Sequence, residues 1–117
     1  KKEINCLVQV NITKESTKSG LYKEDVIDFI KLVSKNYSNI KIRGLMTMAP
    51  FTNDEIILRN TFKELKLLSE SITSENIEDV SMDYLSMGMS NDYEIAIEEG
   101  ANIVRIGTSI FGKRNLT

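Results

Sequence analysis

An arginine stands in a short apolar segment of this sequence, directly before small polar residues. Residues 102–108 read NIVRIGT, so Arg105 lies among aliphatic side chains and two positions before Gly107. A glycine lets the backbone come close to a ligand, and Thr108 adds a hydroxyl group and a main-chain N–H donor. A guanidinium group keeps its proton, so Arg105 would disfavour protonation of a neighbouring ring nitrogen.

Ser90 is a second candidate for ligand chemistry. It follows an apolar segment and precedes a predicted helix. Its hydroxyl group and the next main-chain N–H groups would lie at the positive end of the helix dipole, which favours anions. Gly107 and Thr108 follow a neighbouring predicted strand, so the two loops together could bind one phosphate group.

Ordinary structural roles are alternatives for both candidates. Ser90 could be a plain N-cap residue, and Arg105 could form an ion pair with Asp83, Asp92 or another buried carboxylate. The chain contains no histidine, which excludes Ser-His-Asp triads, Cys-His pairs and most zinc sites made within the chain. We therefore expect no metal site, and any reaction would need a cofactor, a carboxylate, a lysine or a tyrosine.

The elements that must position these residues alternate between strands and helices. The apolar pattern predicts strands over residues 4–12, 40–48, within 80–88 and 102–106, and helices over 23–36, 53–71 and 91–99, with one further turn within 108–114. Thr52 and Glu55 form a capping box that predicts the start of the second helix. Four βα units indicate a parallel α/β sheet, in which ligands bind at the carboxyl ends of the strands. An open doubly wound sheet and half of a (β/α)8 barrel both fit this pattern.

The composition is typical of one globular domain. The 117 residues are 41% hydrophobic and 27% charged, with a net charge of −2. This charge disfavours non-specific binding to nucleic acid, and no segment approaches the roughly 20 apolar residues of a membrane span. The single cysteine, Cys6, and the lack of a signal-peptide pattern predict a cytoplasmic protein.

Three segments of the sequence resemble a known family. They are VQVNITKESTKSG, IRGLMTMAP and LSMGMSNDYEIAIEEGANIVRIGTSIFGKR. These segments are similar to the pyridoxal-phosphate homeostasis proteins, which look like the N-terminal barrel domain of alanine racemase standing alone. The resemblance implies an α/β fold that is the C-terminal half of a (β/α)8 TIM barrel, with residues 1–117 forming a single partial domain.

The same resemblance implies a site for pyridoxal 5′-phosphate. Arg105 would face the pyridine nitrogen of this cofactor. Ser90, Gly107 and Thr108 would hold its phosphate group, with the backbone at Met89 nearby. The spacing from Ser90 to Arg105 also matches that of the corresponding serine and arginine in alanine racemases.

The Schiff-base lysine of the family lies on the first barrel strand, and nothing in this sequence matches it. We therefore expect a fragment that begins at the fifth strand and carries no catalytic residue. The function implied is intracellular binding of pyridoxal phosphate as a carrier or regulator, without established turnover. The alternatives are an amino-acid racemase-like enzyme and a scaffold that binds another phosphorylated metabolite. Half of a barrel leaves strand edges and an apolar face open, so we also expect the chain to self-associate as a dimer.

Overall fold

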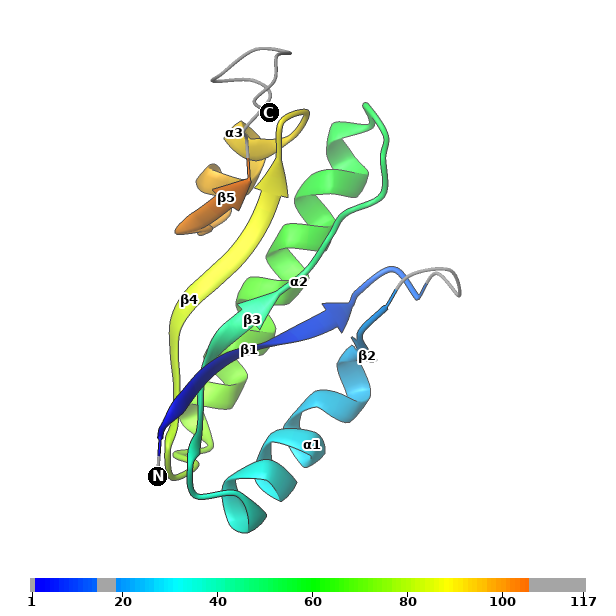
Figure 1. The fold of residues 1–117 in the computed structure, drawn as a ribbon. Coiled ribbons are helices and arrows are strands. Elements are labelled where there is room, and N and C mark those ends of the chain that lie inside the picture. Colours follow the sequence, from blue (N-terminus) through cyan, green and yellow to red (C-terminus); the bar gives the residue numbers. More distant parts are fainter. Residues whose placement is uncertain (1, 15–18, 106–117) are drawn as a thin grey trace.

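The computed structural model describes residues 2–14 and 19–105, which form one parallel sheet with helices. The elements are β1 (Ile4–Asn11), β2 (Leu21–Tyr22), α1 (Lys23–Asn36), β3 (Ile40–Met46), α2 (Glu55–Ser74), β4 (Val80–Met89), α3 (Tyr93–Glu98) and β5 (Ile103–Arg105) (Figure 1). The strand order is β2-β1-β3-β4-β5, and every pair is parallel. The alternation of strands and helices expected from the sequence is confirmed.

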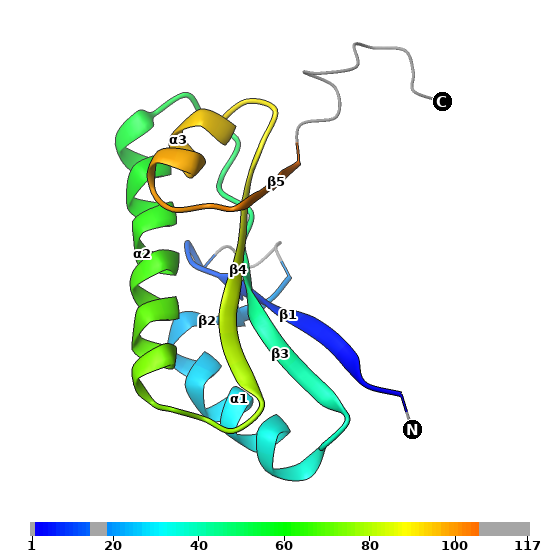
Figure 2. The same cartoon turned by 90° about the vertical axis from the view of Figure 1, so that its left-hand side faces the viewer.

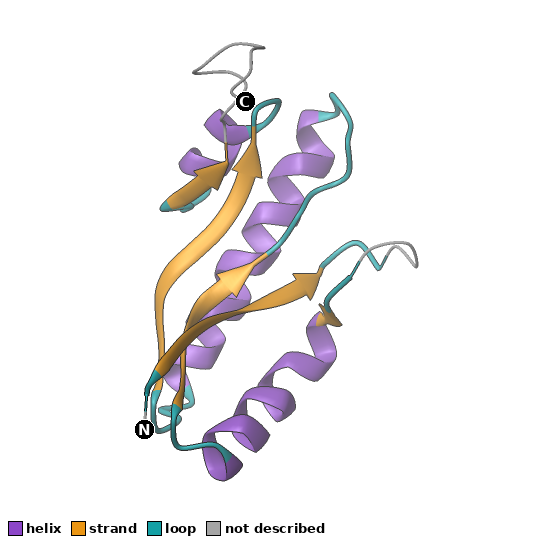
Figure 3. Cartoon of the chain, in the orientation of Figure 1, coloured by secondary structure: helices purple, strands orange, loops and turns teal. Residues whose placement is uncertain are grey.

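The helices all lie on one face of the sheet, as the edge-on view in Figure 2 shows. The core fills the space between the two layers. Val8 and Val10 of β1 are buried there, whereas Leu7 is 37% exposed. Because side chains alternate between the faces of a strand, Leu7 lies on the opposite, open face, which no helix of the described residues covers (Figure 3).

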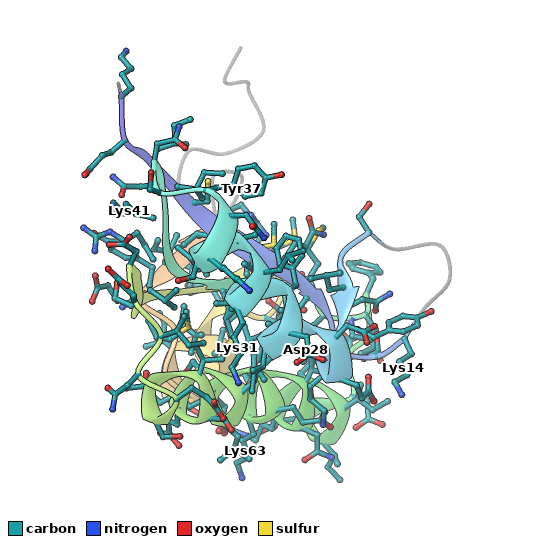
Figure 4. The ribbon with its side chains drawn as sticks, turned by 90° about the horizontal axis from the view of Figure 1, so that it is seen from below. Lys14, Asp28, Lys31, Tyr37, Lys41 and Lys63 are labelled. Carbon is teal, nitrogen blue, oxygen red and sulfur yellow. The ribbon has the colours of Figure 1, made fainter. Side chains whose placement is uncertain are left out.

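Helices α1 and α2 are joined along their outer surfaces by ion pairs. Lys23 Nζ lies 3.1 Å from a carboxylate oxygen of Glu64, and Lys31 Nζ lies 3.1 Å from one of Glu75. Figure 4 shows Lys31 between the two helices, whereas Lys63 points away from α1. All four paired side chains are 39–52% exposed, so water screens these pairs and each contributes little to stability. The apolar core holds the helices to the sheet.

The start of α2 differs from the prediction. The N-cap residue is Asp54, whose carboxylate accepts hydrogen bonds from the main-chain N–H groups of Ile56 and Ile57 at 3.0 and 3.4 Å. The expected capping box of Thr52 and Glu55 is therefore wrong. The Thr52 hydroxyl group instead accepts a hydrogen bond from the N–H of Asp54 at 3.1 Å, within the segment that precedes the helix.

Other boundaries differ by a few residues from the prediction. Helix α2 continues to Ser74, β4 continues to Met89, and α3 begins at Tyr93 rather than at residue 91. The two-residue strand β2 was not expected; it pairs with Val10 and Asn11, so part of the β1 edge that we expected to be open is covered. The further turn predicted within 108–114 lies outside the described residues.

Gly44 allows β3 and β4 to approach each other closely. A Cβ atom built at this position would lie 1.9 Å from the carbonyl oxygen of Tyr84. The register of β3 also shifts near this residue, against both β1 and β4. Any side chain at residue 44 would therefore separate β3 from β4.

We predict that Gly44→Ala lowers the free energy of unfolding by about 3 kcal/mol or more, because the new methyl group overlaps main-chain atoms that cannot move aside. Urea denaturation at a fixed protein concentration would measure this loss. Ser71→Ala, at an exposed position of α2, serves as the control and should change stability by less than about 0.5 kcal/mol. Equal stability of the two variants would contradict the prediction.

Candidate functional site

The carboxyl ends of β4 and β5 bring two of the predicted site residues together. Met89 and Arg105 are paired positions of the two parallel strands, and Ser90 follows Met89 directly. A Cβ atom built at Gly88 would lie 2.7 Å from Ala96 of α3 and 3.3 Å from Val104. Val104 therefore lies on the helical side of the sheet, and strand alternation places Arg105 on the open face.

Arg105 is exposed, and neither carboxylate considered for it from the sequence pairs with it. Asp83 lies 3.7 Å from the guanidinium group of Arg43 and accepts a hydrogen bond from Ser81 at 2.9 Å. Asp92 accepts a hydrogen bond from the main-chain N–H of Met89 at 2.7 Å. Within residues 2–14 and 19–105, the guanidinium group of Arg105 thus remains available to a ligand.

A tight turn over residues 89–92 carries Ser90. The N–H of Asp92 donates to the carbonyl oxygen of Met89 at 3.1 Å, and the Asp92 carboxylate accepts from the N–H of Met89. Ser90 and Asn91 therefore occupy the two central positions of the turn. The N–H of Met89 is directed at Asp92, so it is not presented to a ligand at the open face.

Ser90 is not the N-cap residue of α3. The N-cap residue is Asp92, and the helix begins two residues later than the sequence predicted. The prediction failed because Ser90, Asn91 and Asp92 are three consecutive residues that all favour N-cap positions. The dipole of α3 thus begins beyond Ser90, and the turn itself determines where the serine hydroxyl group lies.

Asn102 fixes β5 beside β4, a role that was not predicted from the sequence. Its side-chain NH2 group donates to the carbonyl oxygen of Asp83 at 2.8 Å, and its side-chain oxygen accepts from the N–H of Leu85 at 2.8 Å. Its own N–H donates to the carbonyl oxygen of Leu85 at 3.1 Å. A polar residue directly before a short apolar strand was the available signal.

Arg59 holds the far end of α3 against α2. Its guanidinium group lies 2.5 Å from Glu98, 2.8 Å from Glu55 and 2.9 Å from Glu99. The hydrogen bonds that it donates to Glu98, Glu55 and Glu99 raise the pKa of Arg59 above its ordinary value, so this cation persists at any practical pH. Helix α3 is only six residues long. The pairs with Glu98 and Glu99 join its end to the longer helix, whereas Glu55 lies on the same helix as Arg59.

Polar side chains also occur at the carboxyl ends of β1 and β3. The hydroxyl group of Thr47 donates to the carbonyl oxygen of Val10 at 2.6 Å. Both Thr47 and Asn11 are buried, with at most 5% of either residue exposed. The Thr47 hydrogen bond ties together two strands that lie away from β5 in the sheet.

The remaining predicted site residues, Gly107 and Thr108, lie outside the described residues. In the part of the chain that the structure describes, no group of three or more Cys, Asp or Glu residues is placed to hold a metal ion. None of the helices described there is both long and apolar enough to cross a membrane.

The sequence matches a family model over nearly its whole length. Residues 1–115 match the model described as alanine racemase, N-terminal domain. The chain belongs to this family. The parallel α/β fold described above and the resemblance found in the sequence are both confirmed by this match.

Relatives of this alanine racemase N-terminal domain include proteins named pyridoxal phosphate homeostasis protein. The protein from Aquifex aeolicus is 41% identical over 110 residues, which cover 94% of this chain and 47% of the relative. The protein from Pasteurella multocida is 37% identical, with 98% of this chain and 48% of the relative covered. The chain thus spans about half the length of the curated relatives it matches.

Solved structures give the same result for the fold. PipY of Synechococcus elongatus without PLP superposes with a TM-score of 0.84 at 27% identity, covering 94% of this chain and 50% of that chain. PipY with PLP bound gives a TM-score of 0.79 at 26% identity, covering 95% and 50%. Alanine racemase from Corynebacterium glutamicum gives 0.74 at 11% identity, covering 97% and 31%, which is evidence for the fold alone.

We predict that Asn102→Asp loosens β5 from β4. The substitution replaces the donor to the Asp83 carbonyl oxygen with a second acceptor, at a cost of about 1–3 kcal/mol. Hydrogen exchange of the β5 amides should accelerate, while exchange in α1 stays unchanged. The same isosteric change at the exposed Asn60 of α2 is the control, and unchanged exchange in β5 of Asn102→Asp would show that its side chain does not hold the strand.

Proposed function

We propose that this chain supplies the ring-nitrogen and phosphate contacts of a pyridoxal 5′-phosphate site, in a protein that binds this cofactor for its homeostasis. The observation that carries the proposal is the placement of Arg105 opposite Met89, beside the turn that holds Ser90. Relatives named pyridoxal phosphate homeostasis protein and the structure of PipY with PLP bound support the same ligand.

The residues at this edge fit the chemistry of the cofactor. Arg105 is a permanent cation on the open face, and beside a pyridine nitrogen it keeps that nitrogen unprotonated. The Ser90 hydroxyl group can donate to a phosphate oxygen, and we assign Gly107 and Thr108 to the same phosphate. The backbone at Met89 lies nearby, and its N–H donates to Asp92.

These contacts favour binding over turnover. Pyridoxal phosphate supplies an electron sink when it is bound, and this sink is weaker when the ring nitrogen is unprotonated. We assign no catalytic residue and no covalent attachment lysine to residues 1–117. We place the protein in the cytoplasm, because the half-buried Cys6 is a free thiol, and we assign it no nucleic-acid or membrane partner.

A titration of the intact gene product that contains this chain tests the proposal. Arg105→Ala should weaken binding of pyridoxal phosphate about tenfold or more, as expected for loss of a hydrogen bond from a charged group, and should change the absorption spectrum of the bound cofactor. Ser90→Ala should weaken binding of pyridoxal phosphate but leave binding of pyridoxal, which lacks the phosphate, nearly unchanged.

Two substitutions on α2 serve as matched controls. Lys63→Ala removes an outward-facing cation (Figure 4), and Ser71→Ala removes an exposed hydroxyl group. Neither control should change affinity for either ligand. Binding that is insensitive to Arg105→Ala and Ser90→Ala in a folded protein would refute the proposed site. Racemisation of amino acids by the loaded protein would favour the enzyme alternative.

We further propose that the isolated chain self-associates as a dimer through the open face. Leu7, Tyr84 and Ile103 are 36–46% exposed on this face and line a hollow of about 280 Å³ together with Asn5, Cys6 and Arg43. Parallel sheets are normally covered on both faces. Burial of these side chains in a second copy would remove their apolar surface from water.

Sedimentation velocity at micromolar concentration should therefore show a dimer of the isolated chain. Tyr84→Lys would replace an aromatic side chain of this hollow with a second cation, in addition to Arg43, and should shift the equilibrium toward monomer. Leu67→Lys, on the exposed side of α2, is the control and should leave the dimer intact. A stable monomer with a cooperative melt would contradict this prediction.

A further inference from the structure

Asp92 is a buried carboxylate that the proposed ligand contacts do not use. Only 6% of the residue is exposed. Burial of a charged group is costly unless the group is hydrogen-bonded. The hydrogen bonds of Asp92 therefore indicate what its side chain contributes.

Asp92 closes the turn over residues 89–92 with two hydrogen bonds to the backbone of Met89. Its carboxylate makes one of them and its own N–H group makes the other. The N–H of Met89 donates to the Asp92 carboxylate at 2.7 Å, a short distance typical of a hydrogen bond to a charged acceptor. The N–H of Asp92 donates to the carbonyl oxygen of Met89 at 3.1 Å. The two ends of the turn thus hold each other, with Ser90 and Asn91 between them.

The same residue joins the turn to the helix and to the strand beside it. The carbonyl oxygen of Asp92 accepts from the N–H of Ala96 in the first turn of α3 at 3.1 Å. Met89, which Asp92 holds, is the β4 position paired with Arg105 of β5. A change at Asp92 would therefore move Ser90 relative to Arg105.

Asp92 fills neither of the two structural roles that are common for such a carboxylate. Its side chain makes no capping hydrogen bond to α3, although it occupies the N-cap position. It also forms no ion pair with Arg105 among the described residues, where its carboxylate bonds to the Met89 N–H. The side chain is directed back toward the end of β4.

We propose that Asp92 is a positioning residue of the ligand site: it fixes the turn over residues 89–92 so that the Ser90 hydroxyl group lies beside Arg105. The proposal rests on the proposed function for the placement of the phosphate. It predicts that Asp92 affects phosphate recognition through Ser90. Direct contact between Asp92 and the ligand is not required.

The test compares pyridoxal phosphate with pyridoxal on four variants of the intact gene product: Asp92→Ala, Asp92→Asn, Asp92→Glu and the double variant Asp92→Ala with Ser90→Ala. Asp92→Ala should lose about as much affinity for pyridoxal phosphate as Ser90→Ala, with less than a threefold change for pyridoxal. Asp92→Asn keeps an oxygen acceptor of the same shape and should retain most of the preference for the phosphate. Asp92→Glu keeps the charge but displaces the acceptor, so it should lose that preference.

The double variant decides whether the two residues act together. It should bind pyridoxal phosphate within about twofold of Asp92→Ala alone, because residues that act on one contact are not additive. The proposal would be overturned if the loss of affinity of the double variant equalled the product of the two single losses. It would also be overturned if Asp92→Ala lost equal affinity for pyridoxal phosphate and for pyridoxal. Tighter binding of pyridoxal phosphate by Asp92→Asn would overturn it too, because that result indicates simple charge repulsion between Asp92 and the phosphate.

Hydrogen exchange measured without ligand tests the role of Asp92 independently of the proposed function. It also distinguishes this role from a general loss of folding. Hydrogen exchange of the Met89 amide should accelerate in Asp92→Ala and stay slow in Asp92→Asn; unchanged exchange in Asp92→Ala would overturn the proposal. If Asp92→Ala does not fold, Asp92→Asn and Asp92→Glu provide the comparison. Asp28→Ala, at an exposed position of α1, is the control. The proposed function fails if Ser90→Ala leaves the preference for pyridoxal phosphate over pyridoxal unchanged. Only the role of Asp92 fails if Ser90→Ala removes this preference and Asp92→Ala keeps it.

Discussion

The pairing of β4 with β5 is the contact on which the candidate site depends. Strand β5 contains three residues, too few to be stable by itself. It is held in place by the side chain of Asn102, by the ladder to β4 and by the packing of α3. Because Arg105 is the last residue of this strand, every contact that fixes β5 also fixes the backbone position from which the Arg105 side chain extends.

Helix α3 connects the turn over residues 89–92 to β5. One end is hydrogen-bonded to Asp92, and the other end is joined by Glu98 and Glu99 to Arg59 of α2. Gly88 makes the close packing of α3 possible, since its φ of +103° and the short distance to Ala96 both exclude a side chain. The candidate site residues are thus connected to the core through a few directed contacts.

The sequence predicted the larger elements well because their signals are local. The spacing of Val26, Ile30 and Val33 is that of a helix face, and α1 is found at the predicted residues. Several polar residues follow one another in 52–55 and in 90–92, and N-cap propensity does not decide which of them caps the helix. Asp54 and Asp92 are the N-cap residues, in place of the predicted Thr52 and Ser90. Strand β2 has two residues and exists because β1 lies beside it, which no local pattern reveals.

The candidate site shows the same division between local and tertiary information. Arg105 was recognisable from the sequence because a charge within an apolar strand is unusual. Its pairing with Met89 depends on a register shift between Ser86 and Met89, a segment that contains Gly88 with its φ of +103°. The roles of Asn102 and Asp92 also arise from hydrogen bonds to main-chain atoms that only the folded chain brings near.

The two-residue strand β2 has a geometric consequence for the β1 edge of the sheet. It occupies the hydrogen-bonding positions at Val10 and Asn11, while the earlier part of the same edge, residues 4–9, carries no strand from the described chain. A parallel strand that adds to this edge must therefore end before Val10, where the pairing with β2 begins. Leu21 and Tyr22 therefore limit how far such a strand can be shifted along β1. In a closed barrel, this shift and the number of strands together determine the barrel diameter.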